Sequence, residues 1–204
     1  MPGGDSRLER MRATLLRESA ILAGLARSLD EGAGRAVDAL LQTRGHVLVG
    51  GAGTSNAIAM RLAHLLCCCG VPAVFLHPSD SLHGSSGAVT DRDTVVLISK
   101  GGKTAEVNRF ARIARERGAR VVAFTETPGS ELGQLSDAVV KVVIPPDSDP
   151  FGMVATSSSL ANGAVADAIC ETILHEKGYS RESFARTHPG GAVGERIERE
   201  GILK

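Results

Sequence analysis

The feature that most constrains the fold is a run of four apolar residues, Val95–Ile98, that leads directly into a turn of small and hydroxyl-bearing residues. Such a run, mostly β-branched, is typical of a strand buried on both faces, as in a parallel sheet. Ser99, Gly101, Gly102 and Thr104 follow, and a helical pattern of apolar residues then begins. A strand, a small-residue turn and a helix in this order form an anion site, because the first helical N–H groups lack intrahelical partners and the helix dipole is positive there. The ligand we expect is a phosphate ester.

A second turn of the same kind, Gly51–Asn56, contains Gly53, Thr54 and Ser55 and also follows an apolar run. Its glycines begin the dinucleotide-binding pattern G-x-G-x-x-G, but Asn56 stands where the third glycine is required. The triphosphate-binding sequence G-x-x-x-x-G-K-[ST] is absent from the chain as well. One phosphate held between two helix starts therefore fits both turns better than a dinucleotide does. The alternative is that both are tight turns whose hydroxyls only cap the following helices.

Apolar runs and helical patterns alternate along the chain, which predicts an α/β fold. We expect strands at His46–Gly50, Ala73–Leu76, Val95–Ile98, Arg120–Phe124 and Ala138–Ile144. We expect helices at Leu8–Leu29, Gly32–Gln42, Ala57–Cys69, Thr104–Arg117, Ser130–Leu135, Thr156–Lys177 and Ser180–Ala185. This alternation indicates a doubly wound, five-stranded parallel sheet with helices on both faces, in which ligands bind beyond the carboxyl ends of the strands.

The two helices before the first strand form an N-terminal arm with an apolar stripe that has to be buried. We expect this stripe to pack on the sheet, and the alternative is that a partner subunit covers it. The chain is expected to be one domain, residues 1–204, made of the helical arm (1–44) and an α/β core (45–196), with a charged tail at the end.

The composition excludes several classes of function. With 23 basic and 23 acidic residues the formal net charge is zero, and only 3% of residues are aromatic, so a nucleic-acid-binding surface is not expected. No apolar run reaches the length that spans a membrane, and the N-terminus lacks a signal-peptide core. The four cysteines, three of them consecutive (Cys67–Cys69), do not suggest a disulfide framework, which favours a reducing cytoplasm.

Further candidate site residues lie at a helix start and in two loops. Four consecutive hydroxyl residues, Thr156–Ser159, open the long helix near the C-terminus, where they either form a polar wall facing a ligand or simply cap the helix. His83 and His188 lie in loops, and because imidazoles titrate near neutral pH, each is a candidate for proton exchange with a sugar hydroxyl. A structural role is the alternative for both. Neither an H-x-x-x-H nor a C-x-x-C pair occurs, so we expect no metal.

Four segments together resemble the sugar isomerase (SIS) domain family. They are Gly51–Ser55, Ser99–Glu106, Phe151–Ser158 and Phe184–Ala192, the last of which reads FARTHPGGA. The resemblance covers roughly residues 35–196, and within the family the chain is most similar to the D-arabinose 5-phosphate isomerases. It implies a flavodoxin-like sheet, sugar-phosphate binding and homo-oligomers, expected to be tetramers, that share active sites.

The resemblance also implies roles for individual residues. His83 and His188 match active-site histidines of the family, and Glu106 matches an acidic residue of that site. We assign substrate and phosphate binding to Gly53, Thr54, Ser55, Ser99, Gly101, Gly102, Thr104, Thr156, Ser157 and Ser158.

Three features depart from the family pattern. Thr54 stands where the isomerases usually carry a lysine, and Asp147 and Asp149 are the acidic residues before the hydroxyl run, where a glutamate is common. The paired CBS domains that often follow the isomerase domain are expected to be absent from this chain. The enediol base therefore stays open between Glu106, the two aspartates and a histidine, as does the exact sugar phosphate.

These roles fit an aldose–ketose isomerisation through an enediol, most simply between arabinose 5-phosphate and ribulose 5-phosphate. A base removes the proton next to the carbonyl and returns it to the neighbouring carbon, while the anchored phosphate holds the reacting carbons still. Such a reaction needs no cofactor, and its partner is a small sugar phosphate. The alternatives are a non-catalytic sugar-phosphate sensor and a ketohexose-phosphate isomerase of the same family.

Overall fold

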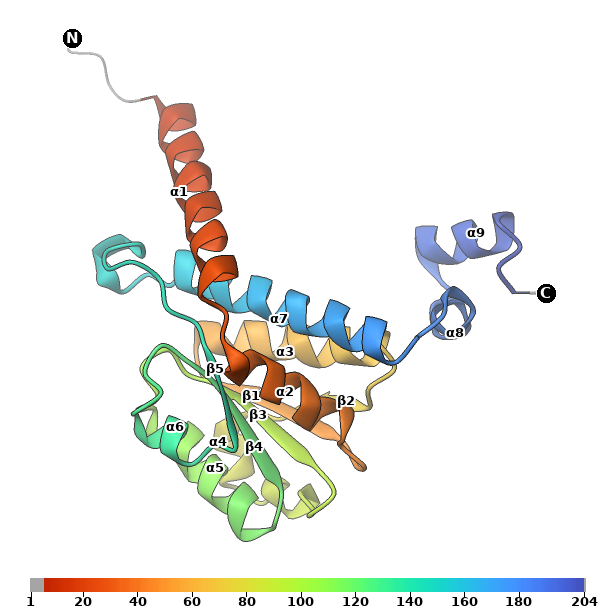
Figure 1. Ribbon diagram of the computed structural model, residues 1–204, viewed down its shortest axis with the longest axis horizontal. Coiled ribbons are helices and arrows are strands. Elements are labelled where there is room, and N and C mark those ends of the chain that lie inside the picture. The colour runs from red at the N-terminus through yellow and green to blue at the C-terminus, as the bar shows by residue number, and fades with distance from the viewer. Residues whose placement is uncertain (1–5, 204) are drawn as a thin grey trace.

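Residues 6–203, which the computed structural model describes, form a central parallel sheet with a layer of helices on each face (Figure 1). The strands are β1 (Val47–Gly51), β2 (Ala73–Phe75), β3 (Thr94–Ile98), β4 (Arg120–Thr125) and β5 (Ala138–Lys141). Their order in the sheet is β2-β1-β3-β4-β5, and every pairing is parallel. This is the flavodoxin-like order, in which the direction of winding reverses between β1 and β3. The predicted fold, a doubly wound five-stranded parallel sheet with N-terminal helices, is confirmed.

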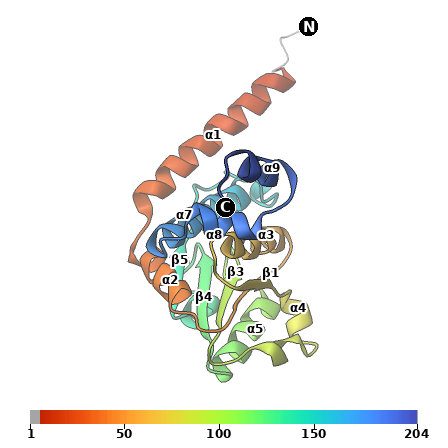
Figure 2. The same cartoon turned by 90° about the vertical axis from the view of Figure 1, so that its right-hand side faces the viewer.

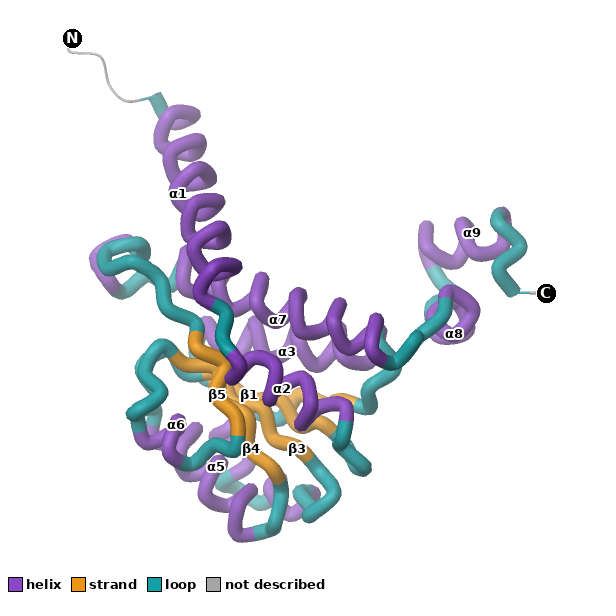
Figure 3. The backbone as a smooth tube through the Cα atoms, viewed as in Figure 1, coloured by secondary structure: helices purple, strands orange, loops and turns teal. Residues whose placement is uncertain are grey.

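Helices cover both faces of the sheet (Figures 1 and 3). On the first face lie α2 (Glu31–Leu41), α3 (Thr54–Cys68) and α7 (Ser157–Glu176). On the second face lie α4 (Pro78–Ser81), α5 (Ala105–Glu116) and α6 (Glu131–Gln134). The connections also contain two short 3-10 helices, η1 (Ser85–Ala88) and η2 (Pro150–Gly152). The remaining helices, α1 (Arg7–Ser28), α8 (Arg181–Thr187) and α9 (Gly191–Arg199), extend beyond these two layers (Figures 1 and 2).

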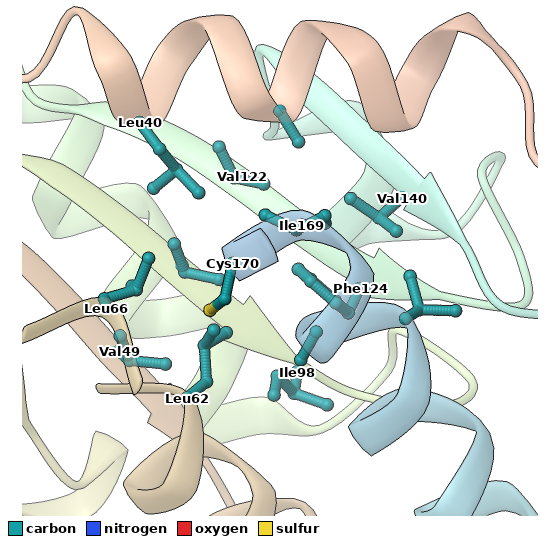
Figure 4. Close-up of a cluster of buried hydrophobic side chains, with 14 of the residues drawn as sticks. Leu40, Val49, Leu62, Leu66, Ile98, Val122, Phe124, Val140, Ile169 and Cys170 are labelled. Carbon is teal, nitrogen blue, oxygen red and sulfur yellow. The ribbon is translucent and has the colours of Figure 1, made fainter. Parts of the chain in front are cut away.

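The core follows from the alternation of side chains along each strand. In β3, Val96 and Ile98 point to the face of α3 and α7, whereas Val95 and Leu97 point to the face of α5, and all four are buried. Figure 4 shows the larger cluster, where side chains of α2, α3 and α7 meet those of the strands around Phe124. Complete burial of such a side chain contributes about 1.5–3 kcal/mol, so the two clusters hold the strand ends, and the turns that follow them, in place.

The N-terminal arm divides into a packed part and a projecting part. Helix α2 packs against β5, as expected, but α1 buries only Ile21 and Leu25, near its C-terminal end. The N-terminal half of α1 leads away from the sheet (Figure 2) and leaves four large apolar side chains 60–72% exposed, Leu8, Met11, Leu15 and Leu16. The expectation that the whole stripe packs on the sheet is therefore wrong for α1, because the helix is longer than the surface available to it.

Other boundaries differ by a few residues. The fifth strand ends at Lys141 instead of Ile144, since the chain then leaves the sheet toward a loop rich in proline. The charged tail contains the helix α9. Among residues 6–203, no helix has the length and apolar character needed to cross a membrane.

Candidate functional site

The candidate site lies at the carboxyl ends of β1 and β3, where the strand order reverses and where sheets of this kind bind ligands. The starts of α3 and α7 and the end of β3 enclose a small cavity of about 50 Å³ there. Its lining consists of Thr54, Ser55, Ile58, Lys100, Ala155, Ser158, Ser159 and Asn162. We call the space that these eight residues line the small cavity.

The turn after β1 brings hydroxyls to the small cavity. Gly53 has φ 59° and ψ −130°, a conformation that glycine adopts readily and other residues rarely do. This conformation lets α3 begin immediately at Thr54. Within the described chain no side chain caps this helix start, so its first N–H groups are open to a ligand. Thr54 and Ser55 both line the cavity.

The turn after β3 is arranged differently. The hydroxyls of Ser99 and Thr104 lie 3.0 Å apart and hydrogen-bond to each other, and Ser99 is buried. Gly102 has φ 63°, and its carbonyl accepts a hydrogen bond from the Asn108 side chain. None of these residues lines the small cavity, and neither does Gly101. They lie beside it, at the start of α5.

Lys100, in the same turn, was not among the residues assigned from the sequence. Its Nζ lies 3.0 Å from Asp149 Oδ2, and the Asp149 side chain is only 3% exposed. The other carboxylate oxygen, Oδ1, accepts a hydrogen bond of 3.0 Å from the backbone N–H of Ser158, in the first turn of α7. Burial of the carboxylate raises the pKa of Asp149, but the hydrogen bonds from Ser158 and the ion pair with Lys100 outweigh it, so the pKa lies below its ordinary value of 3.8.

A lysine directly after a buried strand, between the hydroxyl and the glycines of the turn, was the signal that could have identified Lys100. The partner could not be read in the same way, because Asp149 lies 49 residues further along the chain. Asp149 does not line the small cavity, and its lowered pKa makes it a weaker base than an ordinary carboxylate.

The hydroxyl run at the start of α7 does not form one polar wall. Of its four hydroxyls, only those of Ser158 and Ser159 line the small cavity. The Ser157 hydroxyl is buried and donates to the carbonyl of Ser148 at 3.1 Å. Thr156 lines a separate, more open cavity of about 640 Å³ on the side of Arg61. Successive residues of a helix point about 100° apart, so three consecutive hydroxyls cannot share one direction.

The predicted acid–base residues lie outside the small cavity in this chain. His188 follows α8 and is held at the far end of α3, where its Nε2 lies 3.4 Å from Cys68 Sγ and its ring stacks on Phe184. Because a helix rises about 1.5 Å per residue, Thr54 and Cys68 are about 20 Å apart along α3. The chain therefore does not bring its own His188 to its own cavity.

His83 and Glu106 lie nearer the carboxyl ends of the strands. His83 is exposed in the turn after α4, which follows β2. Glu106 is half-buried in the first turn of α5, beside the turn that carries Lys100. Among residues 6–203, no group of three or more His, Cys, Asp or Glu side chains is placed to hold a metal ion.

Comparison with known proteins agrees with this geometry. The SIS domain family model matches residues 40–171. The chain is 31% identical to the arabinose 5-phosphate isomerase KpsF of Escherichia coli over 92% of its own length and 58% of that protein. It is also 31% identical to the arabinose 5-phosphate isomerase GutQ of Salmonella typhi, over 95% of this chain and 60% of that one. The chain thus spans about six tenths of the length of these curated relatives.

Two solved structures resemble the fold over nearly its whole length. A putative sugar-phosphate isomerase from Listeria monocytogenes has a TM-score of 0.88 and 31% identity, with 93% of this chain and 100% of that chain covered. An E. coli CFT073 protein in complex with arabinose 5-phosphate has a TM-score of 0.86 and 26% identity, with 92% and 100% covered. The flavodoxin-like sheet, the small cavity at its switch point and the family match over residues 40–171 lead to one conclusion: this chain belongs to the SIS domain family.

Proposed function

We propose that this protein is an aldose–ketose isomerase that interconverts arabinose 5-phosphate and ribulose 5-phosphate through an enediol. The observation that carries the proposal is the small cavity, where Ser55, Lys100 and Ser158 converge from three segments at the sheet's switch point. The identity with curated arabinose 5-phosphate isomerases and the relative solved with arabinose 5-phosphate support this choice of sugar.

In this proposal the phosphate is anchored at the helix starts. Ser55 and Ser158 donate hydroxyl hydrogen bonds within the cavity, and the open N–H groups at the start of α3 add to them. The turn after β3 lies beside the cavity, and the sugar extends from the bound phosphate along this turn. Thr54 stays in this binding set, with Gly53 shaping the turn before it. Of the other residues assigned from the sequence, Ser99, Gly101, Gly102 and Thr104 form the neighbouring turn, while Thr156 and Ser157 face other parts of the protein. An anchored phosphate holds the reacting carbons still, which lowers the entropic part of the barrier.

Proton transfer is assigned to Glu106, His83 and His188. We assign the enediol base to Glu106 in preference to Asp149, because Asp149 is buried and its contacts with Ser158 and Lys100 lower its pKa and make it a weaker base. A base takes the proton from the carbon next to the carbonyl and returns it to the adjacent carbon. The two imidazoles move the hydroxyl protons.

His188 has to come from another copy of the chain in this proposal, because it lies at the opposite end of α3 from its own cavity. We therefore infer a homo-oligomer, specifically a homotetramer, in which His188 of the partner subunit completes the site. Exposed apolar surface supports this assembly: it covers the N-terminal half of α1 and the η2 loop, where Phe151 is 86% and Met153 79% exposed. Residues 1–204 would act as one SIS domain, with the arm 1–44 joining subunits and the core 45–196 carrying the site.

We also infer that the protein works in the cytoplasm. The thiols of Cys67, Cys68, Cys69 and Cys170 are free, as in proteins kept in a reducing compartment.

The activity is tested by incubating the protein with a panel of pentose and hexose phosphates and following their interconversion by NMR. We expect arabinose 5-phosphate and ribulose 5-phosphate to interconvert fastest. Faster turnover of a ketohexose phosphate would transfer the assignment to that substrate. Binding of sugar phosphates by calorimetry with no turnover of any of them would contradict the isomerase and favour a sensor.

Shared sites are tested by complementation between two inactive variants, His188→Ala and Glu106→Gln. When the two are co-expressed, sites that combine Glu106 of one chain with His188 of another regain function. Random pairing in a closed oligomer restores about a quarter of the sites. If both residues act within one chain, every site carries one lesion and the mixture stays inactive. An inactive mixture that light scattering shows to be oligomeric would refute the shared site.

A further inference from the structure

We infer that Lys100 is the residue that binds the anionic group of the ligand in the small cavity, an assignment that rests on the proposed function for the identity of that group as a phosphate. Lys100 carries the one charge among the eight residues that line the cavity. The other polar members are hydroxyls and an amide, from Thr54, Ser55, Ser158, Ser159 and Asn162.

The backbone holds Lys100 at a fixed point. Its carbonyl accepts two hydrogen bonds, at 2.8 Å from the Thr125 hydroxyl and at 2.9 Å from the backbone N–H of Glu126. Thr125 is the last residue of β4, the strand beside β3, and Glu126 follows it directly. The side chain of Lys100 therefore starts from the rigid edge of the sheet and not from a free loop.

The ammonium group is held beside the start of α7. Asp149 bridges the two elements, since one oxygen pairs with Lys100 Nζ and the other accepts the N–H of Ser158, each at 3.0 Å. An ammonium has three N–H donors, and the ion pair uses one. The Lys100 side chain is still 41% exposed, whereas that of Asp149 is 3% exposed. The pair therefore presents its cationic side to the cavity and keeps its anionic side buried.

The ammonium adds a full positive charge, which the turn after β1 does not, because the side chains it contributes, Thr54 and Ser55, are neutral. A phosphate monoester carries about two negative charges at neutral pH. Hydrogen bonds to charged groups are worth roughly twice those between neutral groups. Loss of the ammonium should therefore weaken phosphate binding about 10- to 100-fold.

The test is calorimetry with inorganic phosphate and with arabinose 5-phosphate on Lys100→Met, which keeps the aliphatic length and removes the charge. The matched control is Lys103→Met, since Lys103 lies three residues further in the same turn, is exposed and does not line the cavity. Lys100→Arg tests the charge separately from the shape. Thermal unfolding of each variant identifies any that fails to fold.

We expect Lys100→Met to weaken binding of both ligands about 10- to 100-fold, Lys103→Met to leave it within about twofold, and Lys100→Arg to retain part of it. Wild-type affinity in a folded Lys100→Met variant would overturn the inference and leave the pair a structural one, whether or not the protein is an isomerase. Lys100-dependent binding of inorganic phosphate without turnover of any sugar phosphate would uphold the inference and refute the proposed function. If folded wild-type protein binds neither ligand, both fail.

Discussion

Two turns of this protein contain the same kinds of residue and contribute differently. The turn Gly51–Ser55, at the end of β1, leaves Ser55 open to the small cavity. The turn after β3 hydrogen-bonds the hydroxyls of Ser99 and Thr104 to each other, and the side chain that it sends to the cavity is Lys100. Neutral donors thus come from one turn and a cation from the other, because the partners within reach of each turn differ.

The glycines of the two turns differ in how much space surrounds them. Gly53 and Gly102 both have positive φ, at 59° and 63°. A Cβ on Gly53 would meet nothing within 4 Å, whereas a Cβ on Gly102 would overlap the Ser130 Oγ. The first turn is open to a ligand, and the second is packed against the protein. Substitutions in the two turns and at Asp149 test this difference, beginning with the largest effect.

The packed turn should not tolerate a side chain at Gly102. We expect Gly102→Ala to lower the free energy of unfolding by about 3 kcal/mol or more, because strain at positive φ adds to the overlap with Ser130. The matched change is Gly101→Ala, where a Cβ meets nothing within 4 Å, and we expect a change within about 0.5 kcal/mol. Chemical denaturation measures both. Equal losses for the two variants would show that the turn is not packed as described.

The hydroxyls of the two turns should separate binding from stability. We expect Ser55→Ala to weaken phosphate binding by about 1 kcal/mol, since its hydroxyl faces the cavity, with little change in stability. Ser99→Ala should lower stability by about 1 kcal/mol, because it leaves the Thr104 hydroxyl without its partner. Calorimetry and denaturation on both variants test this. A larger loss of affinity for Ser99→Ala than for Ser55→Ala would reverse the assignment of the two turns.

The smallest expected effect is the pH dependence of the stability that Asp149 contributes by contacting both the packed turn and α7. Its pKa is lower in the folded protein than its ordinary value of 3.8, so the unfolded chain takes up the proton first as pH falls. The stabilisation is therefore complete above the ordinary pKa and is lost as pH falls through the folded one. We expect the stability difference between wild type and Asp149→Asn to be constant near neutral pH and to shrink as pH falls below the ordinary pKa of 3.8.

Asp93 provides the control for this pH dependence. It lies at the opposite, amino-terminal end of the strands, and burial raises its pKa while hydrogen bonds from His46 and Thr90 lower it further, to below its ordinary value. Asp93→Asn should show the same loss of acid-dependent stability with unchanged phosphate affinity, since Asp93 is far from the cavity. A difference between wild type and Asp149→Asn that does not vary with pH would refute the stabilisation of the Asp149 carboxylate by Ser158 and Lys100.

Much of the fold could be predicted because it depends on local patterns. Four apolar residues before Ser99 indicate a buried strand, and small residues after it indicate a turn into a helix. The direction of each hydroxyl could not be read in this way. Whether Ser157 or Ser158 faces the cavity depends on the rotation of α7 against the sheet, which the core decides. The roles of His83, His188 and Glu106 in catalysis stay predictions.

By itself the sequence determined the alternation of strands and helices, the two glycine-containing turns and the family, because each of these is recorded in residues close together along the chain. Only the tertiary structure decided which side chains meet. Lys100 pairs with Asp149, which lies 49 residues further along the chain. His188 contacts Cys68 and not the region around Ser55. Contacts of this kind depend on how the elements pack, and packing is set by the whole core at once rather than by any single segment.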